Sequence, residues 1–149
     1  MPDRSFLGTG MKFPPQVNKA TGRFVTASLE ESVKESVYLI LMTQKTERFL
    51  RPQFGSTIMS YTFMDVNATN ITIMKREVQE AILQQEPRVS DVDVTTDGEV
   101  RDGCLLFTVS YTVAETHTRD NLVFPFYLNA VPEEEEYEPE QYEEPTEEV

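Results

Sequence analysis

The feature that most constrains the fold is a change of hydrophobic period at Pro87. Before it, apolar residues recur every three or four positions, as on one buried face of a helix: Ile71, Met74, Val78, Ala81 and Ile82. After it, from Val89 to Val113, they alternate, which is typical of strands. Because proline lacks an amide hydrogen and disfavours helical geometry at the preceding residue, the helix must end near Glu86. The chain therefore combines helices with a sheet.

Two helices are predicted. Ser28 and Glu31 have the spacing of a capping box, so the first helix should begin there and run to about Thr43. Its apolar stripe is formed by Leu29, Val33, Val37, Ile40 and Leu41. The second helix should begin at a cap near Asn67 or Asn70 and run to about Gln85. Residues 46–56 break the helical pattern, and a short packed turn or strand is expected after them.

Three strands are predicted after the second helix. They are Val89–Thr95, a strand whose apolar face runs from Leu105 to Val113, and Leu122–Leu128. Two Asp-Gly pairs between the first two indicate a hairpin connection. Pro125 places the last strand at an edge or a bulge, because a central strand would lose a ladder hydrogen bond there. The predicted fold class is α+β, with two helices packed on one face of an antiparallel sheet of three or more strands.

The chain divides into three parts. Residues 1–27 contain Gly and Pro without a sustained period and read as an extended arm, although their apolar side chains suggest that the arm docks on its own domain or on a neighbour. Residues 28–130 form the α+β domain. Residues 131–149 form an acidic tail, predicted to be disordered because like charges and prolines prevent it from burying a core.

The net charge of −13 comes mostly from this tail. Ten glutamates and no basic residue lie in 132–149, which leaves 16 acidic and 13 basic residues elsewhere. Two interpretations of this charge run compete. In the first, the tail is a solubilising appendage. In the second, it attracts a basic surface of a neighbour, and Tyr137 and Tyr142 anchor it there.

Composition argues against several classes of protein. No stretch of about twenty apolar residues occurs and no signal peptide is recognised, so a cytoplasmic protein without a membrane contact is expected. Cys104 is the single cysteine and His117 the single histidine, so neither a disulfide, a metal centre nor a cofactor is expected. Cys104 shares a strand face with small and polar residues and is interpreted as a packed side chain.

No catalytic constellation emerges either. His117 stands alone in a polar connection, and the glycines near the N-terminus precede no strand–loop–helix pattern. Glu47, Asp65 and Glu86 could in principle form a glycosidase pair, but no apolar pocket is indicated that would raise the pKa of one of them. We expect solvated or ion-paired carboxylates and no enzymatic activity.

Glu86-Pro87-Arg88 permits two interpretations. Arg88 could donate hydrogen bonds to the free carbonyls at the end of the second helix, where positive charge is favourable. Alternatively, the turn could hold the guanidinium outward, toward the carboxylates of a partner. In that case replacing Arg88 should change stability by less than about 1 kcal/mol.

Three stretches together resemble a known family. They are the predicted first helix leading into Thr46-Glu47-Arg48, Arg51-Pro52 and Phe54-Gly55, then Glu86-Pro87-Arg88, and finally residues 121–128 (NLVFPFYL). In this order and spacing, from about Leu7 to Leu128, the chain is similar to the lysozyme-like baseplate wedge family of contractile phages, tailocins and extracellular injection systems, whose type VI secretion member is TssE. Thr46 departs from the glycine that the family has at that turn.

The resemblance implies a fold similar to the interlocking domain of sheath subunits and a structural role in the baseplate. It implies that Glu86, Pro87 and Arg88 contact the core bundle of the other wedge proteins, with Arg51 and Phe54 as further partner-binding residues. It also implies that the sheet, near one end of Leu105 to Leu128, accepts strands from the first sheath ring and so initiates sheath assembly, with Leu122, Phe124 and Phe126 as partner-binding residues. The accepting edge stays open, because Pro125 withholds one donor and could direct pairing to the opposite edge.

The expected partners are therefore the sheath protein and other baseplate wedge proteins, with the tube and hub as further candidates and no nucleic acid. The expected stoichiometry is six copies per baseplate, assembled in the cytoplasm. Two alternatives remain: a peptidoglycan-hydrolysing, lysozyme-like enzyme, and a regulatory adaptor related to protease anti-adaptors. The type of contractile machine stays open.

Overall fold

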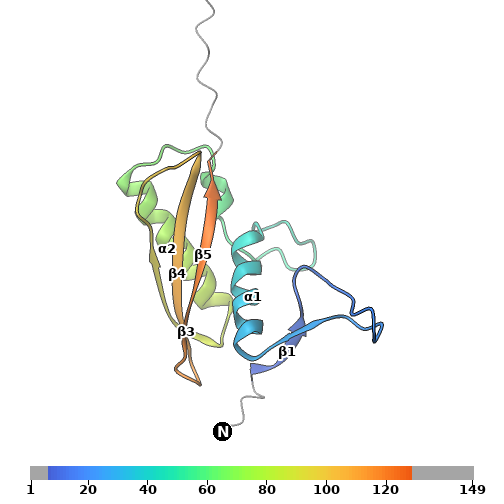
Figure 1. The fold of residues 1–149 in the computed structure, drawn as a ribbon. Helices are drawn as coiled ribbons and strands as arrows, with labels where there is room; N and C mark the ends of the chain where they lie inside the picture. The colour runs from blue at the N-terminus through green and yellow to red at the C-terminus, as the bar shows by residue number, and fades with distance from the viewer. Residues whose placement is uncertain (1–6, 129–149) are drawn as a thin grey trace, which may run out of the picture.

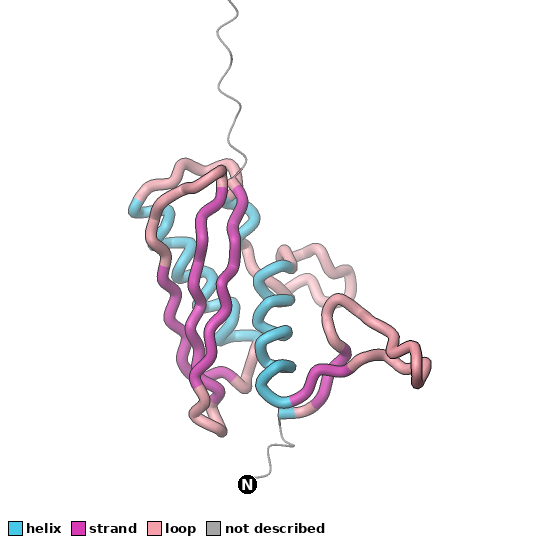
Figure 2. The backbone as a smooth tube through the Cα atoms, viewed as in Figure 1, coloured by secondary structure: helices cyan, strands magenta, loops and turns pink. Residues whose placement is uncertain are grey.

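The computed structural model describes residues 7–128. Its elements in chain order are β1 (Thr9–Met11), β2 (Thr26–Ser28), α1 (Leu29–Met42), the 3-10 helix η2 (Ile58–Tyr61), α2 (Ala68–Gln85), β3 (Val89–Thr95), β4 (Cys104–Val113) and β5 (Arg119–Tyr127). The last three strands form an antiparallel sheet in the order β3-β4-β5. Both long helices pack on one face of this sheet, and the predicted α+β class is confirmed (Figures 1 and 2).

The alternation of side chains decides which face of the sheet is buried. Along β4, the odd-numbered residues from Leu105 to Val113 are buried, while Leu106 on the opposite face is 46% exposed. The register places Leu105 opposite Phe126 and Phe107 opposite Phe124, so that β5 adds its own aromatic rings to the same face. The last strand begins at Arg119, three residues earlier than predicted, and it lies at an edge as Pro125 indicated.

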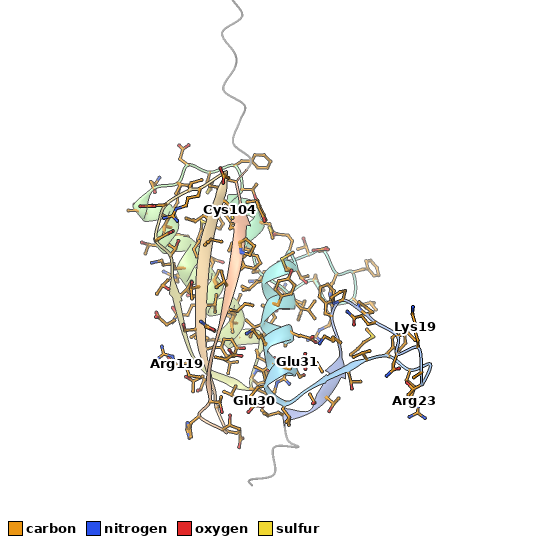
Figure 3. The ribbon with its side chains drawn as sticks, in the orientation of Figure 1. Lys19, Arg23, Glu30, Glu31, Cys104 and Arg119 are labelled. Carbon is orange, nitrogen blue, oxygen red and sulfur yellow. The ribbon has the colours of Figure 1, made fainter. Side chains whose placement is uncertain are left out.

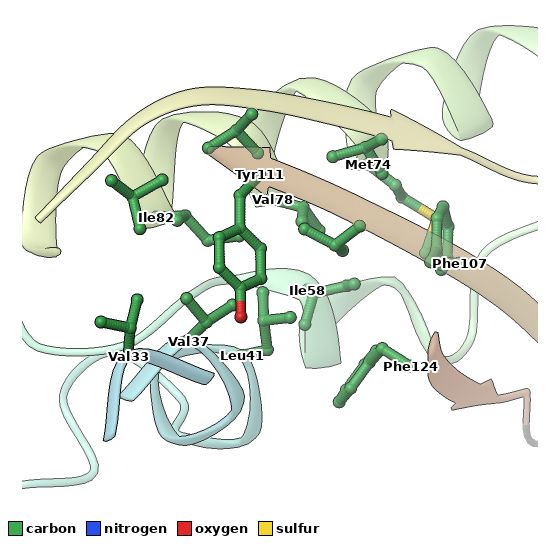
Figure 4. Packing of buried hydrophobic residues seen from close by; sticks show 14 of the residues in the cluster. Val33, Val37, Leu41, Ile58, Met74, Val78, Ile82, Phe107, Tyr111 and Phe124 are labelled. Carbon is green, nitrogen blue, oxygen red and sulfur yellow. The ribbon is translucent and has the colours of Figure 1, made fainter. Parts of the chain in front are cut away.

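The core lies between this face and the two helices. Val33, Val37 and Leu41 of α1 and Val78 and Ile82 of α2 are all fully buried or nearly so. The ring of Tyr111 lies among these residues, as Figure 4 shows. The predicted apolar stripes of both helices are therefore the surfaces that meet the sheet.

The two helix starts are stabilised differently. Asn67 caps α2, because its Oδ1 accepts a hydrogen bond from the Asn70 amide at 2.8 Å. The predicted capping box of α1 is wrong: the Ser28 side chain makes no capping hydrogen bond, and Glu31 pairs instead with Lys12 at 2.7 Å. The Leu29 amide donates to the Gly8 carbonyl, so contacts with the N-terminal segment replace the local cap.

That N-terminal segment is a β-hairpin rather than an irregular arm. β1 and β2 pair antiparallel, and Val17 and Phe24 form a further bridge beyond them. Leu7 is buried in the core, while the hairpin itself projects away from the sheet on the far side of α1 (Figure 1). Strands of three residues are too short to show an alternating pattern, which is why the sequence did not predict them.

Residues 43–67 connect α1 to α2. The expected short turn after Ser56 is η2, which buries Ile58 in the core and leaves Phe63, two residues beyond it, 79% exposed. The predicted acidic tail, residues 131–149, lies outside the described residues. Within residues 7–128, no helix combines the length and apolar character needed to cross a membrane.

Candidate partner-binding site

The Glu86-Pro87-Arg88 turn joins α2 to β3 and is organised by an ion pair. Arg88 donates from Nε to Glu86 Oε1 and from Nη2 to Glu86 Oε2, both at 2.7 Å, in the bidentate geometry that guanidinium and carboxylate favour. The Glu86 side chain is 3% exposed and the Arg88 side chain 26%. The guanidinium is therefore directed into the domain.

Arg88 also holds the N-terminal segment. Its Nη1 donates to the Leu7 carbonyl at 2.7 Å and lies 3.4 Å from Ser32 Oγ on α1. One side chain thus links the start of the chain, α1 and the end of α2. Both interpretations of the Arg88 position require correction, because its guanidinium binds Glu86, Leu7 and Ser32 instead of the carbonyls at the end of α2 or open solvent. Because Glu86 is buried, we now expect the loss of Arg88 to change stability by more than the limit of about 1 kcal/mol predicted from the sequence.

The environment of Glu86 keeps it ionised. Burial opposes the charge, but hydrogen bonds from Arg88 and Ser36 outweigh burial and hold the pKa of Glu86 below its usual value. The pKa of Arg88 is raised, chiefly by its hydrogen bond to Glu86. A general acid of a glycosidase needs the opposite shift. Glu47 and Asp65 are exposed, so the three carboxylates do not form an apolar catalytic pair.

Arg51 and Phe54 lie in the loop between α1 and η2. The guanidinium carbons of Arg48 and Arg51 lie 4.6 and 5.7 Å from the centroid of the Phe54 ring, within reach of a cation–π interaction. Phe49 and Leu50 at the tip of this loop are 94% and 88% exposed.

The base of the same loop is closely packed. Gly55 has φ +109°, and a Cβ there would lie 2.2 Å from the Thr43 carbonyl oxygen, so only glycine fits. Gln85, the last residue of α2, donates to the Gly55 carbonyl and accepts from its amide, at 2.6 and 2.7 Å. This clamp places the loop beside the end of α2, where a hollow of about 310 Å³ is lined by Arg51, Pro52, Gln53, Phe54, Gln84 and Gln85.

The structure therefore brings two of the three predicted stretches together. Gln85 contacts the loop of Arg51 and Phe54, and its neighbour Glu86 begins the turn of Arg88. Gln85 was not among the predicted site residues, because an amide side chain at the end of a helix carries no recognisable signal in the sequence.

The third predicted stretch, residues 121–128, does not present the side chains that were expected to bind a partner. Phe124 and Phe126 are each 1% exposed, and Leu122 is half-buried against the core. Their side chains are core residues rather than a contact surface. The exposed face of β5 carries Val123 and Tyr127 instead, at 54% and 68% exposure, and the alternation of the strand could have identified them.

Within residues 7–128, no strand pairs with the edge of β5 that faces away from β4. The Leu128 amide donates to the Gly103 carbonyl, and residues of an antiparallel pair alternate between facing the partner and facing away. Val123, Pro125 and Tyr127 therefore direct their backbone groups outward, so Pro125 costs the sheet no hydrogen bond. The outward Asn121 amide is already bound by Asp120 Oδ1 at 2.7 Å.

A groove accompanies this edge. It has a volume of about 320 Å³ and is lined by Tyr38 and Met42 of α1, Met59 of η2, and Pro125 and Tyr127 of β5. Its lining is almost entirely apolar, and one wall is the edge of a sheet. Such a site fits an extended peptide segment better than a polar small molecule.

No metal centre appears in the described part of the chain, since residues 7–128 contain no group of three or more His, Cys, Asp or Glu placed to hold an ion. Cys104 is a free, half-buried thiol at the start of β4.

Comparison with known proteins identifies a family and several structures of similar fold. The family model for baseplate wedge protein gp25 matches residues 27–118. A 1.44 Å crystal structure of a candidate tail lysozyme from Geobacter sulfurreducens is 39% identical, with a TM-score of 0.63, and the match covers 73% of this chain and 99% of that one. No curated protein sequence matches the chain.

Two baseplate structures share the fold at lower identity. The anti-feeding prophage baseplate contains a chain that is 21% identical, with a TM-score of 0.58 and coverage of 87% of this chain and 92% of that one. The type VI secretion system baseplate contains one that is 19% identical, with a TM-score of 0.52 and coverage of 66% and 93%. The chain belongs to the gp25 family of baseplate wedge proteins.

Proposed function

We propose that this subunit joins the wedge core of the baseplate to the first ring of the sheath, and that it initiates the sheath by accepting a strand at the free edge of β5. The observation that carries the proposal is the combination of a strand edge that no other described strand pairs with and an apolar groove along it. Soluble proteins normally hide such an edge unless pairing is its purpose.

The geometry favours one end of the strand. An incoming strand can pair with the outward backbone groups of Val123 and Tyr127, while its alternate side chains enter the groove between Tyr38 and Met59. Near the start of β5 the edge is less accessible, because Asp120 occupies the Asn121 amide and approaches Lys34 at 3.5 Å. Pairing is therefore expected over residues 123–127.

The opposite edge of the sheet is a weaker acceptor. The carbonyl of Val92 on β3 is already bound by Gln79 of α2 at 2.8 Å. Because α2 packs directly along β3, a strand added there would compete with the helix for the same backbone groups. The edge of β5 is therefore the one that should receive the sheath strand.

The wedge core should contact the neighbouring pair of segments, the 86–88 turn and the loop of Arg51 and Phe54. Since Arg88 is engaged within the domain, we expect the contact to use exposed Pro87, the shape of the turn, and the exposed Arg51. In this proposal Glu86 and Arg88 act by fixing the turn. Six copies per baseplate, assembled in the cytoplasm with sheath and wedge proteins, complete the proposal.

A proline at Val123 tests the strand addition. Val123→Pro removes an outward donor but no ladder hydrogen bond, so the purified subunit should keep its fold while sheath no longer extends from the baseplate. Val123→Thr, which keeps the amide, is the matched control and should support normal sheaths. Full-length sheaths on Val123→Pro baseplates in electron micrographs would refute pairing at this edge.

A double replacement tests the turn. Glu86→Met with Arg88→Met removes both charges together, which avoids leaving a buried carboxylate unpaired and is expected to keep the domain folded. If the ion pair shapes the turn for the wedge core, the variant should melt cooperatively yet fail to enter baseplates. A folded variant that assembles normally would contradict that role.

A further inference from the structure

The charges of the described chain are unevenly distributed. The segment from Leu7 to Leu29, which contains the β1–β2 hairpin, has three basic residues and no acidic one. The loop of residues 44–56 has three basic residues and one acidic residue. The rest of residues 7–128 has 14 acidic and 6 basic residues. Positive charge is thus concentrated on two projecting segments of an acidic protein.

Within residues 7–128, most of these basic side chains form no ion pair. Lys12 is paired with Glu31, but none of the ion pairs in this range involves the other five cations of the two segments: Lys19, Arg23, Lys45, Arg48 and Arg51. Lys19 and Arg23 lie at the tip of the hairpin, far from the sheet, as Figure 3 shows. The two segments therefore present positive charge that the described part of the domain does not neutralise.

The same segments expose large apolar groups. Six side chains on them are at least 44% exposed: Met11, Phe13, Val17, Phe24, Phe49 and Leu50. Basic and aromatic groups on preformed segments suit a partner that is acidic and carries aromatic rings. In Figure 1 both segments lie on the far side of α1 from the sheet.

The chain itself contains such a partner. Residues 132–149 have ten glutamates, no basic residue, and two tyrosines, Tyr137 and Tyr142. We propose that this acidic segment binds, within the same chain, to the surface formed by the β1–β2 hairpin and the 44–56 loop, which we call the basic face.

Length permits this contact. The 21 residues after Leu128 can span about 70 Å at full extension, whereas a domain of this size has a radius of gyration of about 13 Å. Tethering gives the segment an effective concentration in the millimolar range, so weak individual contacts suffice. The sheet carries a net negative charge, because Asp91, Asp93 and Asp120 outnumber Arg119, and this charge directs the segment away from the sheet and toward the basic face.

The consequence is a subunit whose basic face is occupied before assembly. A baseplate neighbour would reach the hairpin and the loop only by displacing the acidic segment. The basic face adjoins the groove, because the centroid of the Phe13 ring lies 6.1 Å from that of Tyr38, but it contains no residue of β5, where the proposed strand addition takes place. The contact can therefore be tested on the isolated subunit, and the result does not depend on whether a sheath strand is added to β5.

The test compares amide NMR spectra of the full-length protein with those of a chain ending at Ala130. At low salt, shift differences should map to the hairpin and the 44–56 loop, and they should fade by about 0.5 M salt because screening shortens the range of the attraction. Lys19→Glu with Arg23→Glu should abolish the hairpin differences, whereas Lys75→Glu with Arg119→Glu, the same charge change on the acidic part of the domain, should leave them intact.

Three results would overturn the inference. One is identical spectra apart from the residues next to the truncation. Another is a set of differences on the sheet or α2 that persists in the Lys19→Glu, Arg23→Glu variant. The third is a sedimentation coefficient that rises with concentration only when residues 131–149 are present, because the segment would then bind another copy.

Discussion

Two turns of this domain contain the same residue types and use them in opposite ways. In the 86–88 turn, Arg88 forms two 2.7 Å hydrogen bonds to a buried carboxylate and a third to the Leu7 carbonyl. In the 44–56 loop, Arg51 is exposed and its guanidinium lies 5.7 Å from the centroid of the Phe54 ring. Both arginines belong to stretches that resemble the family, yet one stabilises the domain and the other faces solvent.

The difference comes from the counter-charge. Glu86 is buried at the end of α2, where its ionised form must be paired, so Arg88 is drawn inward. The acidic residue of the other loop, Glu47, is exposed and accepts a hydrogen bond from the Gln44 amide, so it does not draw Arg51 into the domain. The burial of the acid therefore decides whether a motif arginine is directed into the domain or toward solvent.

The largest effect should come from Gly55, which fixes the base of the exposed loop. Gly55→Ala places a methyl group against the Thr43 carbonyl in a backbone conformation that alanine avoids, and it should lower the free energy of unfolding by more than about 3 kcal/mol. Thermal and urea melts measure this.

Gly22→Ala is the matched control for that prediction. Gly22 also has a positive φ, +67°, but no atom lies within 4 Å of the position that the new methyl group would take, so only conformational strain of about 1 to 2 kcal/mol is expected. If both variants lost the same free energy of unfolding, the backbone near Thr43 would accommodate the new methyl group with little loss of stability.

Arg88→Ala should have the next largest effect on stability. It leaves Glu86 buried without its cation, and a loss of roughly 3 kcal/mol is expected, at the lower end for a broken buried ion pair because Arg88 is partly exposed. Urea denaturation provides the measurement. Arg76→Ala, which removes an exposed pair with Glu80, should change stability by less than about 0.5 kcal/mol.

The pH dependence of stability sharpens the same comparison. The folded-state pKa of Glu86 is lowered, so its contribution is present above the unfolded pKa of about 4.3 and is lost as the pH falls through the folded value. Wild type should therefore exceed Glu86→Gln in stability at neutral pH, with the gap narrowing below about pH 4.3. A gap that stays constant down to about pH 2 would mean that the carboxylate charge contributes nothing.

Arg51→Ala should have the smallest effect on the fold. The side chain is exposed and its cation–π contact is longer than that of Arg48, so a change within about 0.5 kcal/mol is expected in urea melts. If Arg51 contacts the wedge core, the variant should nevertheless reduce baseplate assembly. If Arg51→Ala lowered the free energy of unfolding as much as Arg88→Ala, the two arginines would contribute equally to the fold, and the comparison between the two turns would be wrong.

Much of the fold could be predicted from local pattern alone. The alternation in β3 and β4, the helical stripes of α1 and α2 and the stop at Pro87 identify the elements, because each reflects which side chains must avoid water. Pro125 likewise indicated that β5 lies at an edge, since proline cannot donate to a ladder. The hairpin of β1 and β2 escaped prediction because its strands are too short to show a period.

The candidate site was less predictable for a physical reason. Sequence motifs identified Glu86, Arg88, Arg51 and Phe54 as notable residues, but the direction of each side chain depends on groups distant in the chain. Leu7, 81 positions from Arg88, supplies the third acceptor of its guanidinium. Ser28 shows the same effect, because contacts with the hairpin replaced its expected helix cap.

The sequence by itself determined the two long helices, the three strands of the sheet, its buried face and the separation of acidic and basic segments, since these follow from composition and period. Only the tertiary structure decided that Arg88 turns inward, that Phe124 and Phe126 belong to the core, and that the edge of β5 borders an apolar groove. Such properties depend on which distant groups meet, and the free energy of pairing or burying them is set by the assembled fold.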